Sequence, residues 1–271
     1  MAARTQEEKT ANLVGPGYRR RMTARGILSG FVVATAFFTR IPVAPPACRA
    51  EPLADAAWAF PLVGAGIGGV AALIFLVVQL LGLGDWLAGV FAVLAGVVLT
   101  GALHEDGFAD AADGLIGGYD RDQRLAIMRD SRHGTFGVMA LVLSVLLRAA
   151  ALAGIGEPIY AGLALIAAHA GSRAALPLAM LMLAPVRADG LGAGAGRPSM
   201  APAIAALAIG LLVSLASLGP ARGLVAIGLA GAAMFALGVL AYRRIGGYTG
   251  DVLGAFQQIG EIVVLLAAAA K

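Results

Sequence analysis

Three aspartates at helical spacing suggest the clearest chemistry in the chain. Residues 104–114 read HEDGFADAADG, where Asp106, Asp110 and Asp113 stand at positions i, i+4 and i+7. On a helix this spacing places the three carboxylates on one face, about one turn apart. Such a row of like charges is costly unless a cation neutralises it. Because Mg²⁺ binds carboxylates, water and substrate phosphates, these three residues are predicted to be the ligands of a divalent metal that handles a phosphorylated substrate.

A candidate phosphate-binding segment follows the acidic run. Asp130, Ser131 and Arg132 come shortly before Thr135, where the next apolar run begins. Hydroxyls, free backbone N–H groups and an arginine at a helix start form an anion site that the helix dipole favours. We therefore expect these four residues to contact substrate. Asp120, in contrast, is expected to lie on a solvated helix face.

A second polar group lies in GGYTGDVLGAFQQIGE at residues 246–261. Asp251 begins another apolar run, and Thr249 is its expected N-cap. Gly250 lets the backbone approach a phosphate or ribose closely. Glu261 falls well inside the run, where an ionisable side chain is a functional candidate by default. Thr249, Gly250, Asp251 and Glu261 therefore join the candidate substrate-binding residues.

Glu261 has two interpretations that the sequence leaves open. Arg148 and Arg173 also stand inside apolar runs, and His169 is placed four residues before Arg173. An ion pair between Glu261 and either arginine would be purely structural, whereas an unpaired Glu261 would be available to substrate.

The rest of the sequence predicts a membrane protein. Its 271 residues are 59% hydrophobic and only 13% charged, and the mean hydropathy is +0.85. Soluble domains average about 25% charged residues, and a membrane span needs about 20 apolar residues. The predicted fold class is therefore all-α, a polytopic membrane helix bundle. Seven spans are expected, near residues 59–83, 85–103, 135–155, 158–184, 201–219, 222–241 and 252–270.

Shorter features complete this organisation. The apolar stretch 27–39 is too short for a further span and is expected to be an interfacial or re-entrant segment. Residues 1–26 are predicted to form a basic cytoplasmic N-terminal extension, and residues 27–271 a single membrane-embedded domain. The one cysteine, Cys48, excludes an intrachain disulfide and a cysteine metal site.

Arginine placement orients the predicted bundle. With seven spans, the N-terminal segment and the loops 104–134, 185–200 and 242–250 share one side, and these segments are rich in arginine. Of the basic residues, only Arg222 and Lys271 lie on the opposite side. The positive-inside rule makes the basic side, with the candidate site, cytoplasmic. The net charge of +4 follows from this bias, and contacts with lipid headgroups account for most of these arginines. It does not indicate nucleic acid binding.

Five blocks of sequence, in order, resemble the cobalamin synthase family. These are the adenosylcobinamide-GDP ribazoletransferases, which close the nucleotide loop of vitamin B12. Arg40, in the first block, joins the candidate substrate-binding residues. One departure is Glu105, which stands where the family usually has an apolar residue. The blocks are FFTRIPV at 37–43, FPLVGAGIGG at 60–69, HEDGFADAADGLIGG at 104–118, IMRDSRHGTFG at 127–137 and GGYTGDVLGA at 246–255.

The resemblance implies a Mg²⁺-dependent, multi-pass transferase of the bacterial cytoplasmic (inner) membrane, with its active site on the cytoplasmic face. Its substrates would be adenosylcobinamide-GDP and α-ribazole or its 5′-phosphate, and its products GMP and adenosylcobalamin or its 5′-phosphate. In such chemistry Asp106, Asp110 and Asp113 would hold one or two Mg²⁺ at the pyrophosphate, and Arg132 would hold phosphate oxygens. His104 is a candidate catalytic residue, as a general base or as the partner of an acid.

Two other classes of function stay open on sequence alone. A CDP-alcohol-type phosphotransferase of lipid synthesis also uses an acidic helix, although the full motif of that family is not present. A secondary transporter places ionisable groups near the membrane midplane at broken helices, whereas seven of the 16 acids here lie in one predicted loop. The sequence also leaves open the number of metal ions and the oligomeric state, a homo-oligomer included.

Overall fold

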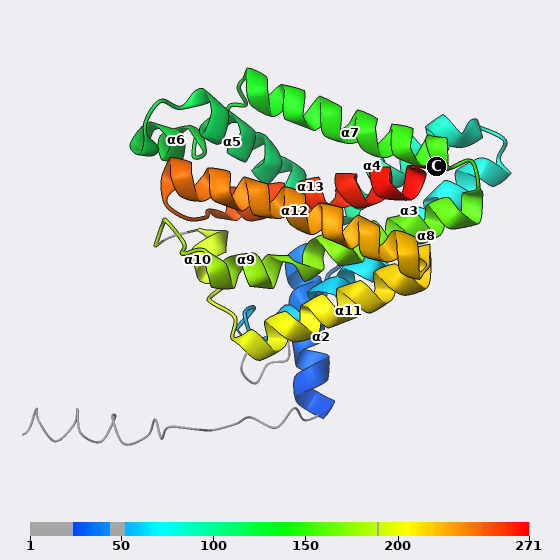
Figure 1. Ribbon diagram of the computed structural model, residues 1–271, viewed down its shortest axis with the longest axis horizontal. Helices are drawn as coiled ribbons and strands as arrows, with labels where there is room; N and C mark the ends of the chain where they lie inside the picture. The colour runs from blue at the N-terminus through cyan, green and yellow to red at the C-terminus, as the bar shows by residue number, and fades with distance from the viewer. Residues whose placement is uncertain (1–23, 44–51, 189, 271) are drawn as a thin grey trace, which may run out of the picture.

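Helices account for nearly all of the regular structure in this computed structural model, which describes residues 24–43, 52–188 and 190–270 (Figure 1). Within those ranges there is no β-strand, and a single parallel bridge joins Pro185 to Tyr248. The all-α prediction is confirmed. Most of the predicted N-terminal extension, together with Cys48, lies outside the described residues.

Six of the predicted spans are present as helices long and apolar enough to cross a membrane. Their ends agree with the predicted spans to within a few residues. A short break separates α8 from α9 just before Pro177. Proline has no backbone N–H to donate the hydrogen bond that would continue α8 into α9. The six are α3 (Phe60–Leu80) with the preceding 3-10 turn η1 (Ala57–Ala59), α7 (Thr135–Ile155), α8 (Pro158–Ala174) with α9 (Leu176–Met182), α11 (Met200–Leu218), α12 (Pro220–Ile245) and α13 (Gly250–Ala269).

The seventh predicted span, near residues 85–103, corresponds to the first of two helices joined by a sharp break. Helices α4 (Gly84–Thr100) and α5 (Leu103–Gly117) are apolar enough to cross only when taken together, and they meet at 94°. Gly101 and Ala102, between them, both adopt left-handed backbone conformations with φ of 64° and 59°. Such a conformation ends a helix and is uncommon for alanine. The acidic segment expected in a loop is thus a helix that follows α4 after a sharp bend, the geometry of a broken span or a re-entrant segment.

The remaining helices are short. Helix α2 (Ala24–Phe38) has 15 residues and does not qualify as a span. It projects away from the bundle (Figure 1), and its C-terminal end packs into the core through Ala34 and Phe38. The prediction of a short N-terminal segment that does not span is confirmed. Helix α6 (Arg121–Ile127) links α5 to α7, and α10 (Leu191–Gly194) lies between α9 and α11.

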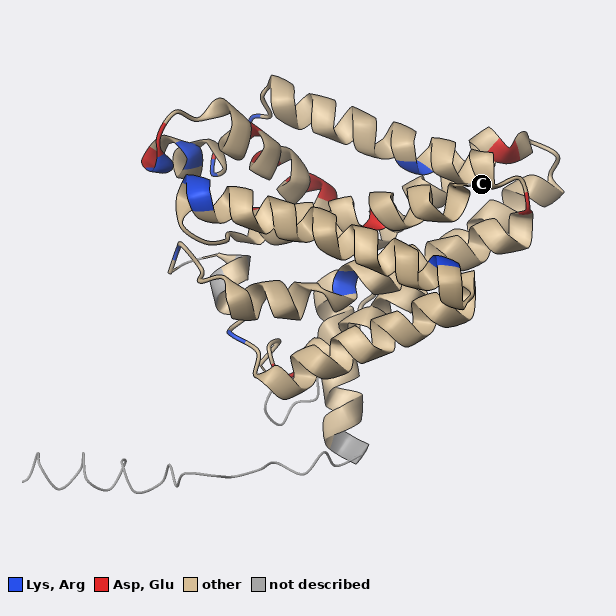
Figure 2. Cartoon of the chain, in the orientation of Figure 1, with Lys and Arg blue, Asp and Glu red and all other residues tan. Residues whose placement is uncertain are grey.

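The loops predicted to share one side of the membrane do meet at one end of the bundle. Arg121 Nε of α6 donates a hydrogen bond to the Ile245 carbonyl at the end of α12, 3.0 Å away. The backbone N–H of Val186 donates to the Tyr248 carbonyl, also at 3.0 Å. Figure 2 shows charged residues gathered at this end, around α5, α6 and the end of α12. We call it the polar end of the bundle.

Candidate functional site

A pocket of about 190 Å³ contains polar residues from both predicted clusters. Helix α5 contributes His104 and Asp106, and the start of α13 contributes Thr249 and Asp251. Arg187, from the loop after α9, also lines it. The structure therefore brings together two segments that are far apart in the chain. Aromatic and aliphatic side chains form the rest of the wall, among them Phe37, Phe38, Phe60, Leu176 and Met180.

Two glycines allow the helices α5 and α13 to touch at this pocket. A Cβ atom on Gly107 would lie 3.0 Å from the Asp251 Cα, and one on Gly254 would lie 3.1 Å from the His104 carbonyl oxygen. Any side chain at either position would push the helices apart. The absence of side chains here is what places Asp106 beside Asp251.

Two carboxylates, those of Asp106 and Asp251, line the pocket, and Asp110 lies near them without lining it. Asp106, Asp110 and Asp251 lie close enough for their charges to interact. His133 Nδ1 lies 3.5 Å from Asp110 Oδ1, and an Arg187 guanidinium nitrogen lies 3.6 Å from Asp251 Oδ2. The site therefore combines an acidic wall with one guanidinium group at Asp251.

The third predicted metal ligand, Asp113, has a different partner. It is buried, and its two oxygens accept hydrogen bonds from the backbone N–H groups of Gly134 at 2.6 Å and Gly137 at 2.9 Å. These donors belong to the first turn of α7, whose positive dipole end favours a carboxylate. Asp113 is thus a tertiary cap of α7. In the part of the chain that the structure describes, no three His, Cys, Asp or Glu side chains are grouped as a ready metal site.

The predicted phosphate-binding turn lies outside the pocket. The Arg132 guanidinium donates to both Asp130 oxygens, at 3.0 and 2.7 Å. These bonds lower the pKa of Asp130 to about 2. Ser131 and Thr135 are exposed and do not line the pocket. Because Asp113 occupies N–H groups at the start of α7, the structure differs from the expectation of a free anion site there.

Thr249 caps α13 and also lines the pocket, together with Gly250. The Thr249 hydroxyl accepts a hydrogen bond from the Val252 N–H at 3.3 Å, as an N-cap does. The same residue lines the pocket, and Gly250 follows it as the first residue of α13. The capping role predicted for Thr249 is confirmed, and it holds Asp251 at the pocket wall.

His104 is placed to contact a ligand. It is only 4% exposed, and its ring stacks on Phe38 with centroids 5.7 Å apart. It lines the pocket, yet its Nε2 atom is buried without a hydrogen-bond partner. A buried unpaired nitrogen costs free energy, and a ligand in the pocket would remove that cost.

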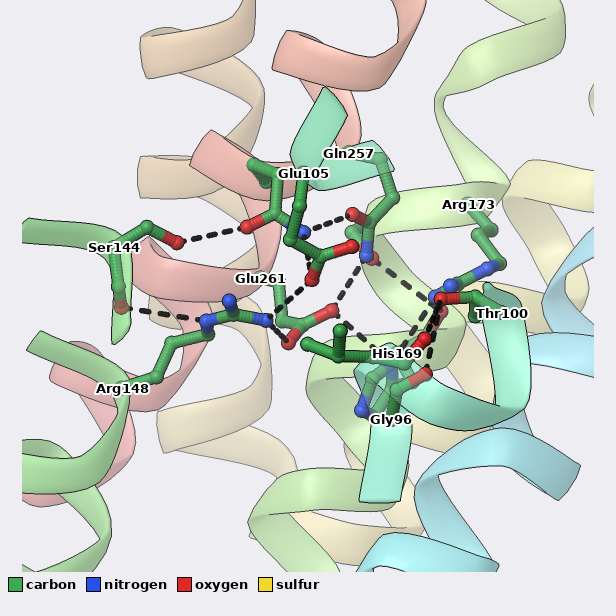
Figure 3. A network of polar contacts seen from close by, with 12 residues as sticks. Gly96, Thr100, Glu105, Ser144, Arg148, His169, Arg173, Gln257 and Glu261 are labelled. Atoms are coloured by element: carbon green, nitrogen blue, oxygen red, sulfur yellow. Dashed lines mark hydrogen bonds and ion pairs between the residues drawn. The ribbon is translucent and has the colours of Figure 1, made fainter. Parts of the chain in front are cut away.

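Beside the pocket lies a buried network of ion pairs (Figure 3). Arg148 Nη1 of α7 lies 3.2 Å from Glu105 Oε1 of α5 and 2.9 Å from Glu261 Oε1 of α13. His169 Nδ1 of α8 lies 3.1 Å from Glu261 Oε2. The structural interpretation of Glu261 is therefore the one observed, with Arg148 as partner, while Arg173 donates instead to the His169 carbonyl at 3.1 Å.

Side-chain amides extend this network. Gln258 donates to Glu105 at 3.1 Å and accepts from the Ser144 hydroxyl at 2.8 Å. Gln257 donates to Glu261 at 2.5 Å and to the Ser172 hydroxyl at 3.3 Å. Glu261 does not line the pocket. The network joins α5, α7, α8 and α13 just beyond the α4–α5 break, and so fixes the start of the acidic helix.

Two arginines lie in places that differ from the sequence-based expectation: one lies outside the pocket and the other lines it. Arg40 was expected at the substrate, but it is exposed and does not line the pocket, and its backbone N–H donates to the Leu99 carbonyl at 2.8 Å. Arg187 was missed as a site residue. Its only sequence signal was an arginine in a polar loop, which is also typical of headgroup contacts.

Comparison with known proteins identifies the family. The model of the cobalamin-5-phosphate synthase family matches residues 30–269. The chain belongs to this family. The resemblance seen in the sequence blocks is thereby confirmed.

Curated members of the family match over nearly their whole length. A protein of Bradyrhizobium diazoefficiens is 47% identical, covering 92% of this chain and 96% of its own. One of Azorhizobium caulinodans is 48% identical, covering 89% and 95%. One of Mesorhizobium japonicum is 43% identical, covering 91% and 95%. All three are named adenosylcobinamide-GDP ribazoletransferase. No solved structure matches the chain.

Proposed function

We propose that the protein joins adenosylcobinamide-GDP to α-ribazole or its 5′-phosphate and releases GMP. A ribose hydroxyl oxygen bonds to the phosphorus attached to cobinamide, and the bond from that phosphorus to the bridging oxygen of GMP breaks. The hydroxyl proton passes to a base, and GMP leaves with the bridging oxygen. The observation that carries this proposal is one pocket lined by Asp106, Thr249, Asp251 and Arg187, from three separate segments.

The side chains present suit this reaction. Transfer of a phosphoryl group depends mainly on positioning and on neutralising charge, because the protein has little covalent chemistry to perform. Arg187 would hold a phosphate oxygen, and Thr249 a hydroxyl or phosphate group. His104 Nε2, Asp106 and Asp251 are the groups in the pocket that can accept the hydroxyl proton.

The donor set also suits a magnesium ion, with one change from the sequence-based set. Mg²⁺ in such sites commonly uses one or two carboxylates and takes its other ligands from water and substrate phosphates. Asp106 and Asp251, which line the pocket, and the neighbouring Asp110 are the carboxylates that would hold it, whereas both oxygens of Asp113 accept hydrogen bonds from the start of α7. When bound, the ion would neutralise charge that develops on the pyrophosphate oxygens.

We also propose that the polar end faces the cytoplasm of a bacterium, so that the protein is an inner-membrane enzyme. The arginine-rich loops meet at this end, and such loops are retained on the cytoplasmic side. Water-soluble substrates would then reach the pocket from the compartment that holds nucleotides.

The test is GMP release by purified protein with Mg²⁺, adenosylcobinamide-GDP and α-ribazole. D106N and D251N keep the side-chain shape but remove a charge, so we expect turnover to fall roughly a thousandfold, as for a lost metal or phosphate contact. D120N is the matched control, because Asp120 is a solvent-exposed cap of α6 and asparagine caps equally well. Full activity in D106N and D251N would contradict the assignment of the site.

The same preparation separates the alternative functions. A CDP-alcohol-type phosphotransferase would consume a CDP-activated lipid and leave adenosylcobinamide-GDP intact. A transporter would release no GMP from either substrate. Absence of GMP release under all conditions would therefore refute the proposed function.

A further inference from the structure

A second hollow lies on the side of the bundle made by α9, α11 and α12. Its volume is about 520 Å³, and apolar side chains form nearly all of its wall. Helix α12 lines it from Ile227 to Arg243, a stretch that rises about 24 Å at 1.5 Å per residue. The pocket lined by Asp106 and Asp251 shares none of these residues. We call this hollow the α12 groove.

Small residues line part of the groove. Gly171 and Ala175 line it from α8 and the α8–α9 break, and Gly210 lines it from α11. On α12, Gly231 points into open space, since a Cβ there would meet no atom within 4 Å. The groove is therefore apolar and open beside Gly231, as the space for a hydrocarbon chain is.

One end of the groove has a different chemistry. Tyr242 and Arg243 line it there, in the last turn of α12, at the polar end of the bundle. No carboxylate among the described residues pairs with Arg243, which is exposed. A guanidinium at the mouth of an apolar groove is complementary to an anionic phosphate whose attached chains are apolar.

We propose that the α12 groove binds an anionic phospholipid of the surrounding leaflet. One acyl chain would lie along α12 beside Gly231, and the phosphate would contact Arg243 and the Tyr242 hydroxyl. The groove is longer than half of the roughly 30 Å hydrocarbon core, so it accommodates a chain that runs from headgroup depth past the midplane. The bound lipid would replace the packing that α9, α11 and α12 do not provide for one another.

The experiment measures lipid bound to purified protein by native mass spectrometry, after titration with phosphatidylglycerol or phosphatidylcholine. G231L fills the groove, and G228L is its matched control, because Gly228 is also on α12 with open space around it but does not line the groove. We expect wild type and G228L to retain phosphatidylglycerol at equal affinity and G231L to lose it at least tenfold.

A second pair of variants tests the headgroup contact without altering the apolar wall of the groove. R243Q should lower the preference for phosphatidylglycerol over phosphatidylcholine about tenfold, whereas R244Q, whose position does not line the groove, should leave it unchanged. Equal loss in both arginine variants would show a diffuse surface charge effect and overturn the site. A disulfide between two copies of a G231C variant in native membranes, with Cys48 replaced, would also overturn it, because a second copy would then occupy the groove. The arginine pair decides the question should G231L fail to fold.

Discussion

Replacement of Asp113 by asparagine distinguishes the metal role predicted from sequence from the structural role seen here. Asn keeps the shape of the side chain but supplies only one acceptor oxygen. Two backbone N–H groups, of Gly134 and Gly137, now donate to the two carboxylate oxygens. In D113N one of them faces an NH₂ group and loses its bond, and the negative charge at the start of α7 is lost.

The magnitude follows from those two losses. A lost cap typically costs about 1 kcal/mol. A buried charge at a helix N-terminus contributes up to about 2 kcal/mol, and Asp113 is only 7% exposed, so solvent screens it little. We therefore expect D113N to lower the free energy of unfolding by about 2 to 3 kcal/mol. The acidic wall of the pocket is unchanged, so turnover of the folded protein should stay within a few-fold of wild type.

Two measurements on the same sample decide between the roles. Thermal unfolding in detergent reports stability, and GMP release at a temperature where the variant is folded reports turnover. D106N should show the reverse pattern, with normal stability and little activity. If D113N unfolded like wild type but lost turnover a hundredfold or more, Asp113 would be a ligand of the reacting centre and the capping argument would be refuted.

Three further predictions concern the network, the helix contact and the topology. R148M removes the guanidinium between two buried glutamates and should destabilise the protein by about 3–5 kcal/mol; stability near that of wild type would show that the two acids need no partner. G107L should separate α5 from α13 and abolish GMP release, whereas G69L, at a position with open space, should be active; an active G107L would contradict the close helix contact. A cysteine at Asp120, with Cys48 replaced, should resist an impermeant reagent on intact cells while one at the C-terminus reacts, and the opposite pattern would reverse the proposed orientation.

The spans were predictable because long apolar runs have few alternatives in a chain so poor in charge. The break after α4 was not, since it depends on left-handed conformations at Gly101 and Ala102. A glycine followed by alanine is common inside helices that stay straight, so the local sequence carries no distinct signal. The predicted span at 85–103 matches α4, but the sequence did not show that the acidic segment forms a second helix bent by 94° from it.

The site was predictable in part. A common membrane face is enough to bring Asp106 near Asp251, and the two do line one pocket. Spacing alone could not assign Asp113, because residues on one helix face can meet different neighbours along its length. The N-terminus of α7 crosses near the end of α5, and only tertiary packing determines that. Arg187 was hidden for a related reason, as a loop residue has no periodic pattern.

The buried network has a consequence for how the chain is assembled in the membrane. Its acids and bases come from four helices, and Glu261 is on α13, which is synthesised after the other three. Insertion of a charged side chain at the centre of a helix costs about 3 kcal/mol. Until α13 joins the bundle, Arg148 and His169 lack the glutamate that pairs with both, so a nascent or truncated chain would hold unbalanced charge within the bilayer. Helix α13 therefore completes the network electrostatically as well as sterically.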